Sequence, residues 1–507
     1  MAADASARTT TGRHPLDVAL VALCPLVIAI QPLANNDLPM HLAIGEWILG
    51  HGTLPAHDPF SFTAGHPPWV PHEWLAALLF AGVERAGGLE GLVALTAVFA
   101  ATLALVHRAV MARLGVGLAT HLLWGIPMWL VAGDRIVLRP HLPALVLPFA
   151  VWWVLLHARR NPRFLALLPA LLAIWVNLHG SFPMGFGIVA LDLVVFGRGH
   201  PLAWRPRLLA IAACAIAFFA QLHVYFQPTL LAGVEDALGL LRDPVFMEEI
   251  SEWQPPFASP RFRETFAFQA SLPWILLAAV GFVRHGARLP RSYRAFALVA
   301  LLLYLRHSRF IDLMALASLP FLPDLDSAPA RAALRRTWSA RGATALAALF
   351  CVWPGFPIRP GQAFRRPALR WGHDLPFAAV DALLERGYEG GVFCEYKFGG
   401  VVAWRSGGRL QPSMDSRNSV YGAQLYHAHS EAMIRDTPFR RELLERVGAV
   451  LILRPTPRRD RSDLIEHLKR AKRWQLVHAS ERSLLFVKAP APGESEPAAQ
   501  SRRPDSP

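Results

Sequence analysis

The sequence predicts a polytopic α-helical membrane protein that carries a C-terminal extracytoplasmic α/β domain. Of its 507 residues, 53% are hydrophobic and only 17% are charged, and the mean hydropathy is +0.31. A soluble protein of this size carries more charge. Several apolar runs approach the ~20 residues that are needed to cross a bilayer. From residue 375 the composition changes to that of an ordinary soluble domain, and all the lysines of the chain lie there.

The formal net charge of +14 comes mainly from arginine. In a soluble chain this charge would suggest nucleic-acid binding. In a membrane protein, arginines set the orientation of the spans, so we expect no nucleic-acid partner. The sequence contains no Walker loop, dinucleotide fingerprint or zinc-ligand spacing, which argues against nucleotide-driven chemistry. Its cysteines follow neither a metal-binding nor a disulfide pattern.

The first predicted span runs from residue 16 to residue 33, after a polar segment, 1–13, that we expect in the cytoplasm. A long first outer loop, 34–88, follows it. This loop is aromatic and half apolar, which is typical of short amphipathic pieces on a membrane surface. Its last part, 72–88, is short for a span and is predicted to be a helix on the outer surface. The alternative is a short true span, which would invert the orientation of everything downstream.

Arginine clusters decide between these two frames. With 72–88 outside, the loops expected inside contain most of the arginines and few acids, as the positive-inside rule requires. The chain then has about eleven spans. After the first, they are predicted at 89–106, 117–133, 141–157, 164–178, 183–197, 206–223, 268–283, 295–305, 310–323 and 342–356. The inner arginines are Arg108, Arg113, Arg159, Arg160, Arg163, Arg198, Arg205, Arg207, Arg284, Arg288, Arg291, Arg294, Arg331, Arg335, Arg336 and Arg341.

The predicted domains are therefore a transmembrane domain (1–356), a linker (357–374), an extracytoplasmic α/β domain (375–490) and a disordered tail (491–507). The protein is expected in the cytoplasmic (inner) membrane with a cytoplasmic N-terminus. In the α/β domain we expect helices at 376–387, 439–447 and 463–473 and a strand at 449–455. Strands around a glycine turn are expected at 390–404, and a hairpin at 474–490.

Asp37 lies just past the outer end of the first span. A carboxylate there can accept a proton from a sugar hydroxyl or help to hold a divalent cation. The alternative is an aspartate that caps a helix at the interface. For Asp58, which precedes a proline, we favour a turn role over a role in the outer cavity.

Four arginines at the predicted outer face suit a phosphate group, because guanidinium binds phosphate oxygens bidentately and keeps its charge. For any single arginine, snorkelling or pairing with Asp134 or Asp312 is the favoured explanation. For the set we favour binding of an isoprenoid-phosphate donor. The four are Arg135, Arg139, Arg306 and Arg309.

Other polar residues at this face are candidates for binding an acceptor or lining the cavity. Glu252 and Trp253 suit a sugar by hydrogen bonding and ring stacking, although a solvated loop face is the default interpretation. His72 and Glu73 begin the predicted surface helix, where Glu73 also suits the first helical turn. His141 begins a span. Asn177 and His179 are also explained by a hydrogen bond to each other.

The loop at Asp37–Leu49, Asp58–Thr63 and His72–Leu75 resembles that of the GT-C superfamily of membrane glycosyltransferases. The closer likeness is to bacterial relatives of the dolichyl-phosphate-mannose protein mannosyltransferases. That group shows similar motifs elsewhere, and the likeness covers most of the chain. These motifs match Arg139-Pro140-His141, Asn177-Leu178-His179-Gly180, Glu252-Trp253, Phe398-Gly399-Gly400 and Asp415-Ser416-Arg417-Asn418.

The resemblance implies a polyprenyl-phosphate sugar as donor, inversion at the anomeric carbon and a catalytic Asp37. The acceptor would be a cell-envelope glycan or protein. Asn35 and Asn36 precede Asp37 where the superfamily often has adjacent acids, so base catalysis is favoured over metal binding, and a divalent cation is the only cofactor left open. Two alternatives remain. The first is a non-catalytic GT-C-fold scaffold or polysaccharide-assembly subunit, and the second is a lipid transporter, which Asp192 and Asp312 support weakly.

Overall fold

A computed structural model describes residues 15–30, 33, 35–69, 71–219, 244–326, 341–342, 371–372, 375–455 and 461–489. The chain forms two compact units, each of which we describe by itself. The helical unit comprises Met1–Leu33, Gly87–Tyr225 and Phe246–Arg370. The loop–tail unit comprises Ala34–Ala86, Phe226–Val245 and Trp371–Pro507. The first outer loop, which we placed with the transmembrane domain, thus groups with the C-terminal domain.

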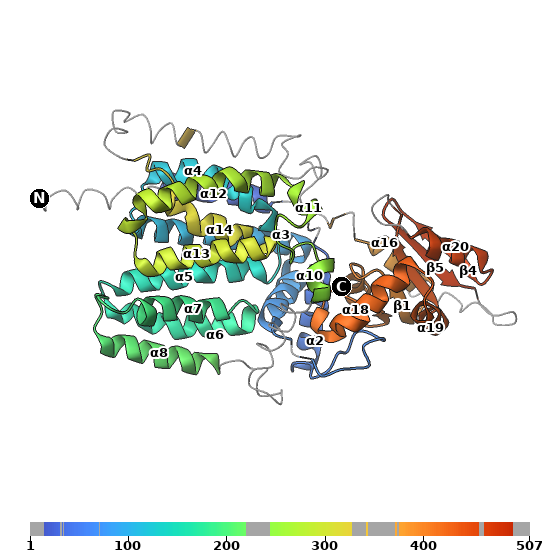
Figure 1. The fold of residues 1–507 in the computed structure, drawn as a ribbon. Helices are drawn as coiled ribbons and strands as arrows, with labels where there is room; N and C mark the ends of the chain where they lie inside the picture. Colours follow the sequence, from blue (N-terminus) through green and yellow to red (C-terminus); the bar gives the residue numbers. More distant parts are fainter. Residues whose placement is uncertain are drawn as a thin grey trace, which may run out of the picture. The chain divides into compact units, whose positions relative to one another are not determined.

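The helical unit is a set of apolar helices (Figure 1). Its first part contains α1 (Pro15–Ala29), α4 (Leu118–Ala132), η1 (Gly133–Arg135), α5 (His141–Ala158), η2 (Pro162–Leu167), α6 (Leu168–Leu178), α7 (Pro183–Ala190), η3 (Leu191–Val195) and α8 (Trp204–Phe218). Its second part contains α10 (Pro244–Glu249), α11 (Pro260–Arg263), α12 (Phe266–His285), η5 (Gly286–Arg288), α13 (Arg291–Arg306), η6 (Ser308–Phe310), α14 (Ile311–Ser318) and η7 (Leu319–Phe321).

The predicted spans up to residue 323 correspond to these helices within a few residues, because apolar runs bounded by Gly, Pro and Arg mark helix ends well. In the part of the chain that the structure describes, three helices are long and apolar enough to cross a membrane: Trp74–Arg113, His141–Ala158 and Phe266–Arg288. Pro15–Ala29, Pro162–Leu178 and Pro183–Val195 are shorter apolar helices. The count of about eleven spans stays a prediction. The segments predicted at 342–356, 357–374 and 491–507 lie almost wholly outside the described residues.

The helix α3 (Trp74–Arg113) is broken at Gly88, whose φ of 55° and ψ of −147° are not helical. Glycine suits this position because a side chain would strain a backbone with positive φ. Residues before the break belong to the loop–tail unit and those from Gly87 onward to the helical unit. The break falls where the sequence separates a surface helix, 72–88, from a span, 89–106.

The loop–tail unit contains a five-stranded mixed sheet with strand order β2-β1-β3-β5-β4. The strands are β1 (Gly390–Cys394), β2 (Leu410–Pro412), β3 (Ala449–Leu453), β4 (Trp474–Ala479) and β5 (Ser483–Lys488). β1 pairs in parallel with β2 and β3, whereas β5 pairs antiparallel with β3 and β4. Phe62 of the first loop donates its N–H to the carbonyl oxygen of Pro412 at 3.4 Å, beside the edge strand β2.

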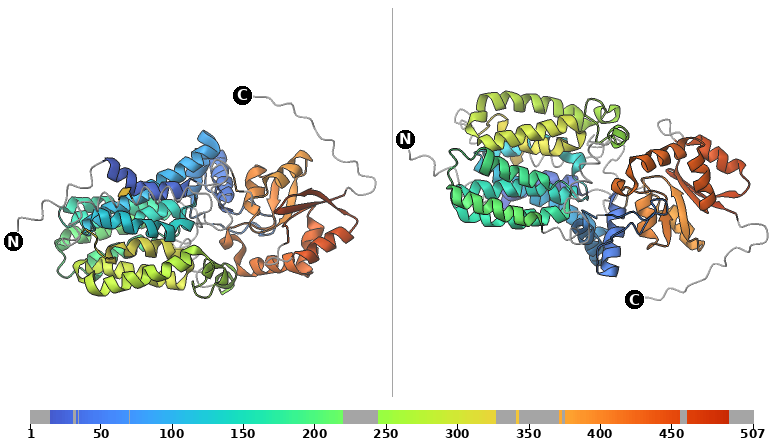
Figure 2. Two further views of the ribbon diagram at one scale, coloured as in Figure 1. Left: turned by 90° about the horizontal axis from the view of Figure 1, so that it is seen from above. Right: turned by 60° about the horizontal axis from the view of Figure 1, so that its bottom comes forward.

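Helices cover both faces of this sheet (Figure 2). The helices α16 (Phe377–Glu385) and α17 (Gly399–Arg405) pack on one face, where Val392 and Cys394 point. The other face, which receives Phe393 and Val450, is covered by α18 (Asn418–Ile434), α19 (Pro438–Arg446) and α20 (Ser462–Arg470). Alternate residues of a strand point to opposite faces, so both sets of strand residues are buried.

One predicted element of this domain is wrong. Residues 401–404, expected as a strand after a glycine turn, belong to helix α17 (Gly399–Arg405). The physical reason is topological, because β1 and β2 are parallel and a parallel pair needs a crossover connection, which is usually a helix. The sequence interpretation also missed β2 and α18, whereas the expected helices at 376–387, 439–447 and 463–473 and the hairpin at 474–490 are present.

The helix α2 (Leu38–His51) is held by two close glycine contacts within the loop–tail unit. A Cβ on Gly45 would lie 2.2 Å from the carbonyl oxygen of Ala77 in α3. A Cβ on Gly400 at the start of α17 would lie 2.9 Å from the amide nitrogen of Met40. Glycine at both positions therefore lets the backbones of α3 and α17 approach α2 closely.

Replacing Gly45 with alanine is expected to destabilise this unit by about 1–3 kcal/mol, because the added methyl group has no space. Gly50 is the matched control, since it lies in the same helix and a Cβ there meets nothing within 4 Å. Gly50→Ala should leave the melting temperature unchanged or raise it slightly, because alanine favours a helix over glycine. Thermal unfolding of both purified variants checks this, and equal melting temperatures would contradict the packing explanation.

Candidate functional site

A cluster of arginines in the helical unit surrounds the carboxylate of Glu252. Arg135 Nη1 lies 2.8 Å and Arg139 Nη1 lies 3.4 Å from Glu252 Oε2. The guanidinium of Arg309 lies over the ring of Trp253, 5.3 Å from its centroid. Trp253 is only 8% exposed, so its ring packs under a cation and offers little open stacking surface. We call these five residues the arginine cluster.

The arginines of the arginine cluster lie at or beside helix ends, whereas Glu252 and Trp253 lie in a turn between α10 and α11. Arg135 is the last residue of η1 after α4, and Arg139 lies two residues before the first residue of α5. Backbone hydrogen bonds fix the loop of Glu252 against η6, since the N–H of Arg309 donates to the carbonyl oxygen of Glu252 at 3.0 Å. His307 Nδ1 also lies 2.8 Å from the carbonyl oxygen of Trp253. The cluster is therefore built on rigid elements, which suits a binding site.

The charge of Glu252 is stabilised by its neighbours. Burial alone would raise the pKa of its carboxyl group, but the charges of Arg135, Arg139 and Arg309 hold that pKa below its usual range. Glu252 therefore stays ionised at neutral pH. Arg135 also acts on the carboxylate of Asp312, so three guanidinium groups and two carboxylates lie in one neighbourhood.

A second polar pair lies beside the arginine cluster at the start of α5. His141 Nε2 is 2.6 Å from the buried carboxylate of Asp312, and Arg135 is close enough to act electrostatically on Asp312. The rings of His141 and His179 are 6.3 Å apart, and His179 Nδ1 lies 2.8 Å from Ser181 Oγ. The structure thus brings most of the predicted outer-face residues of this unit together.

Arg306 is the exception among the four predicted phosphate-binding arginines. It is the last residue of α13 and is exposed, whereas the other three act on Glu252. Asn177 donates to the carbonyl oxygen of Ala173 at 2.8 Å, one helical turn before it. This contact to its own helix supplies a structural role for Asn177.

Asp37, in the loop–tail unit, directly precedes α2. It is half-buried, and its side chain makes no capping hydrogen bond to that helix. Asn36 Nδ2 donates to Asp37 Oδ1 at 3.1 Å, and Asn35 Oδ1 accepts the N–H of Asp37 at 3.0 Å. The two asparagines therefore orient Asp37, so the capping explanation for this residue loses its main support.

Glu73 lies between two histidines in the same unit. Its carboxylate is 3.6 Å from His41 Nε2 of α2 and 3.9 Å from His72 Nε2. Among the described residues of the chain, no three His, Cys, Asp or Glu side chains are grouped as ligands of a metal ion. The described residues thus supply no ligand set for the divalent cation that the sequence left open.

The contacts of Asp58 in the loop–tail unit indicate a structural role. Its carboxylate accepts the N–H groups of Phe60 and Ser61, at 2.9 Å and 3.2 Å, which is the turn role that the sequence favours. It also pairs with Arg417 Nη1 at 2.7 Å. Burial would raise the pKa of Asp58, but Arg417 holds it below its usual range.

The sequence interpretation missed the role of Arg417, although it quoted the motif that contains it. Arg417 also binds Asp415 at 2.6 Å, and its guanidinium lies 4.9 Å and 4.7 Å from the ring centroids of Phe60 and Trp69. Its side chain is only 7% exposed. The sequence shows only that Asp415 lies two residues before Arg417, and the fold is needed to show that the second acid, Asp58, comes from the first loop.

Solved structures provide the comparison for this fold. No protein-family model matches the chain, and no curated protein matches it by sequence. The oligosaccharyltransferase AglB from Archaeoglobus fulgidus, in complex with an inhibitory peptide and a dolichol-phosphate, matches with a TM-score of 0.57 and 12% identity, over 88% of this chain and 70% of AglB. ArnT from Cupriavidus metallidurans, bound to undecaprenyl phosphate, matches with a TM-score of 0.50 and 13% identity, over 93% and 97%.

The fold is a GT-C fold. The chain is a multi-pass membrane protein that resembles GT-C glycosyltransferases in structure, although its identity to them is low. The finer likeness to relatives of the protein mannosyltransferases stays a prediction, as do the orientation in the membrane and the roles of the site residues.

Proposed function

We propose that the protein is a glycosyltransferase that moves a sugar from a polyprenyl-phosphate donor to an acceptor at the outer face of the cytoplasmic membrane. The observation that carries this proposal is the arginine cluster, in which Arg135, Arg139 and Arg309 gather at one end of a membrane helix bundle. AglB and ArnT, which share the fold, were solved with a dolichol-phosphate and with undecaprenyl phosphate.

The charge of the arginine cluster suits the leaving group better than the donor. A polyprenyl-phosphate sugar is a phosphodiester with one negative charge, whereas the released polyprenyl phosphate is a monoester that carries close to two. Guanidinium groups beside the phosphate attract the dianionic monoester more strongly than the monoanionic diester. Interactions that strengthen as the leaving group gains charge lower the barrier of the transfer step.

Asp37 supplies the base in this proposal. The acceptor hydroxyl gives its proton to the Asp37 carboxylate, and its oxygen forms a bond to the anomeric carbon of the sugar. The bond from that carbon to the phosphate oxygen breaks with its electron pair, and polyprenyl phosphate leaves. Attack on the face opposite the leaving phosphate inverts the anomeric carbon.

Replacing Arg139 with glutamine is expected to raise the KM for the donor about tenfold or more and to lower kcat. A charge-assisted hydrogen bond to phosphate contributes about 1.5–3 kcal/mol, and about 1.4 kcal/mol corresponds to tenfold. Steady-state kinetics of the purified full chain in lipid nanodiscs with a labelled polyprenyl-phosphate sugar measures both constants.

The control for this experiment is Arg263→Gln, which removes an exposed arginine from the short helix α11. It should leave both constants unchanged. If the wild-type chain neither transfers sugar nor retains polyprenyl phosphate with any donor tested, the proposed function is wrong. Retention of the lipid phosphate without transfer would favour the non-catalytic alternative instead.

A further inference from the structure

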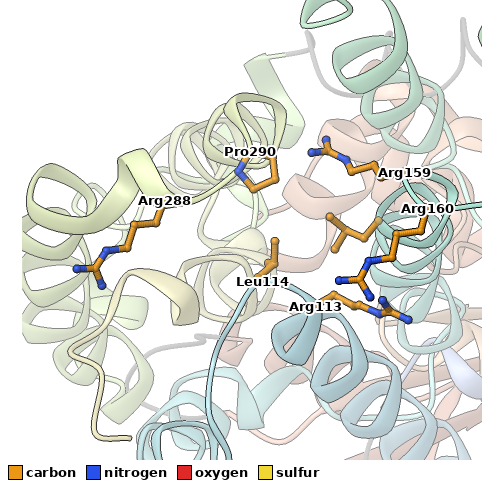
Figure 3. A pocket seen from close by; sticks show the side chains of 7 residues that line it. Arg113, Leu114, Arg159, Arg160, Arg288 and Pro290 are labelled. Carbon is orange, nitrogen blue, oxygen red and sulfur yellow. The ribbon is translucent and has the colours of Figure 1, made fainter. Parts of the chain in front are cut away.

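A cavity of about 260 Å³ lies at a different end of the helical unit and is lined by four arginines (Figure 3). Arg113 is the last residue of α3, and Arg159 and Arg160 directly follow α5. Arg288 ends η5, after α12. None of the residues that line this cavity is acidic. Three helix ends, far apart in the sequence, therefore line one opening, with the guanidinium group of Arg288 pointing away from the other three arginines (Figure 3).

Most of this positive charge has no carboxylate next to it. Arg159 pairs with the buried Asp192 at 2.5 Å, which also contacts His200 at 3.2 Å. Arg113 Nη2 lies 2.6 Å from His157 Nε2, a contact to a ring nitrogen and not to an anion. Within the described ranges, the ion pairs include no acid on Arg113, Arg160 or Arg288. Clustered guanidinium groups of this kind attract phosphate oxygens.

The cavity and the arginine cluster lie at opposite ends of the same helix. His141 begins α5 and Arg159 follows its last residue, and the 18 residues of α5 are among those long and apolar enough to cross a membrane. At 1.5 Å per residue, the two ends are about 27 Å apart, close to the thickness of the hydrocarbon core. An anion held at this cavity is therefore not the donor phosphate held at the arginine cluster.

We propose that this cavity binds the phosphodiester head group of an anionic phospholipid from the leaflet opposite the arginine cluster. Its volume suits a head group and is small for a complete ligand. Leu114, Leu156 and Pro290 line it together with the arginines. Apolar surface beside the cations favours a lipid, whose acyl chains need it, over a free phosphate ion. Basic pockets between membrane helices bind anionic lipid head groups in this way.

The positive-inside rule alone explains arginines in these loops, but it requires only their charge and not a shared cavity. Arg163 separates the two explanations. It lies three residues after Arg160, is equally exposed, and does not line the cavity. Its loss should therefore change the charge of this end as much as the loss of Arg160 while leaving the binding of the head group intact.

Native mass spectrometry of the delipidated full chain in detergent tests this proposal. Phosphatidylglycerol, phosphatidylcholine and inorganic phosphate are titrated against wild type, Arg160→Gln/Arg288→Gln, Arg163→Gln and Arg139→Gln. Wild type should retain phosphatidylglycerol in preference to the other two. The double variant should bind it about tenfold more weakly or worse, because each arginine near the head group adds attraction. Arg163→Gln and Arg139→Gln should bind it as wild type does.

Several outcomes would overturn the assignment. Equal binding of phosphatidylglycerol by wild type and the double variant would exclude the cavity. If Arg163→Gln weakens the binding of phosphatidylglycerol as much as the double variant does, the effect comes from net charge and not from the cavity. If wild type retains inorganic phosphate as well as phosphatidylglycerol, the ligand is a soluble phosphate. A loss only in Arg139→Gln would place the lipid at the arginine cluster. Because donor turnover is not measured, failure here leaves the proposed transferase activity standing. A single sharp melting transition confirms that each variant is folded.

Discussion

Asp37→Asn is expected to lower the rate of sugar transfer by about 10²- to 10⁴-fold, the range that general-base catalysis contributes. Asparagine keeps the size of the side chain but cannot accept a proton at neutral pH. The fold should be unaffected, since Asp37 makes no capping bond to α2 and asparagine is as good a residue at a helix start. Transfer from a labelled polyprenyl-phosphate sugar, measured with saturating donor, gives the rate.

Glu46→Gln is the matched control for Asp37→Asn. Glu46 lies in α2, which Asp37 directly precedes, and it pairs with the exposed Arg85, so this variant also removes one carboxylate from the same segment. It should transfer sugar at the wild-type rate, because an exposed ion pair contributes little. If Asp37→Asn also transfers at that rate, Asp37 is not the base, even though the transferase proposal remains.

Arg417→Ala is expected to lower the free energy of unfolding of the loop–tail unit by about 3–5 kcal/mol. The substitution leaves Asp58 and Asp415 buried without their shared cation, and both carboxylates are fully inaccessible to solvent. It also removes the cation from between Phe60 and Trp69. Denaturant unfolding of the full chain, followed by hydrogen exchange in peptides of this unit, measures the change.

Arg446→Ala tests whether burial causes that effect. Arg446 also joins the tail to the first loop, through a hydrogen bond of 3.1 Å to the carbonyl oxygen of Phe62 and a ring contact of 5.4 Å to the same residue. Its side chain is 46% exposed, so we expect a loss of about 1 kcal/mol or less. If both variants lose a similar free energy of unfolding, burial of Arg417 does not explain its effect on stability.

Much of the helical unit follows from the sequence, because the membrane imposes a simple rule. Each apolar run must satisfy its own backbone groups, so it forms a helix wherever it is long enough. The start of α5 at His141 and that of α12 near residue 266 are therefore close to prediction. The grouping of Arg135, Arg139 and Arg309 was a hypothesis from helix ends alone, and the exposed position of Arg306 depends on packing that the pattern does not encode.

The loop–tail unit was harder to predict for a different reason. Whether residues 399–405 form a strand or a helix depends on the parallel pairing of β1 with β2, a non-local property. The ion pair between Asp58 and Arg417 likewise joins two segments that the predicted domain boundaries separated. Local patterns identified Asp58 as a turn residue, and its hydrogen bonds to neighbouring N–H groups agree with this. Such patterns carry no information about its ion pair with the distant Arg417.

The first loop has a consequence for how the C-terminal domain can be used as a module. Phe62 approaches the edge strand β2, and Arg417 takes one of its two carboxylate partners from Asp58. A fragment of residues 375–490 alone would expose the edge of β2, which could then pair with another chain. In that fragment Arg417 would keep Asp415 as a partner but lose Asp58. Chimeras with proteins of similar fold should therefore exchange the loop and the tail as a pair, because separating them would yield aggregation-prone products.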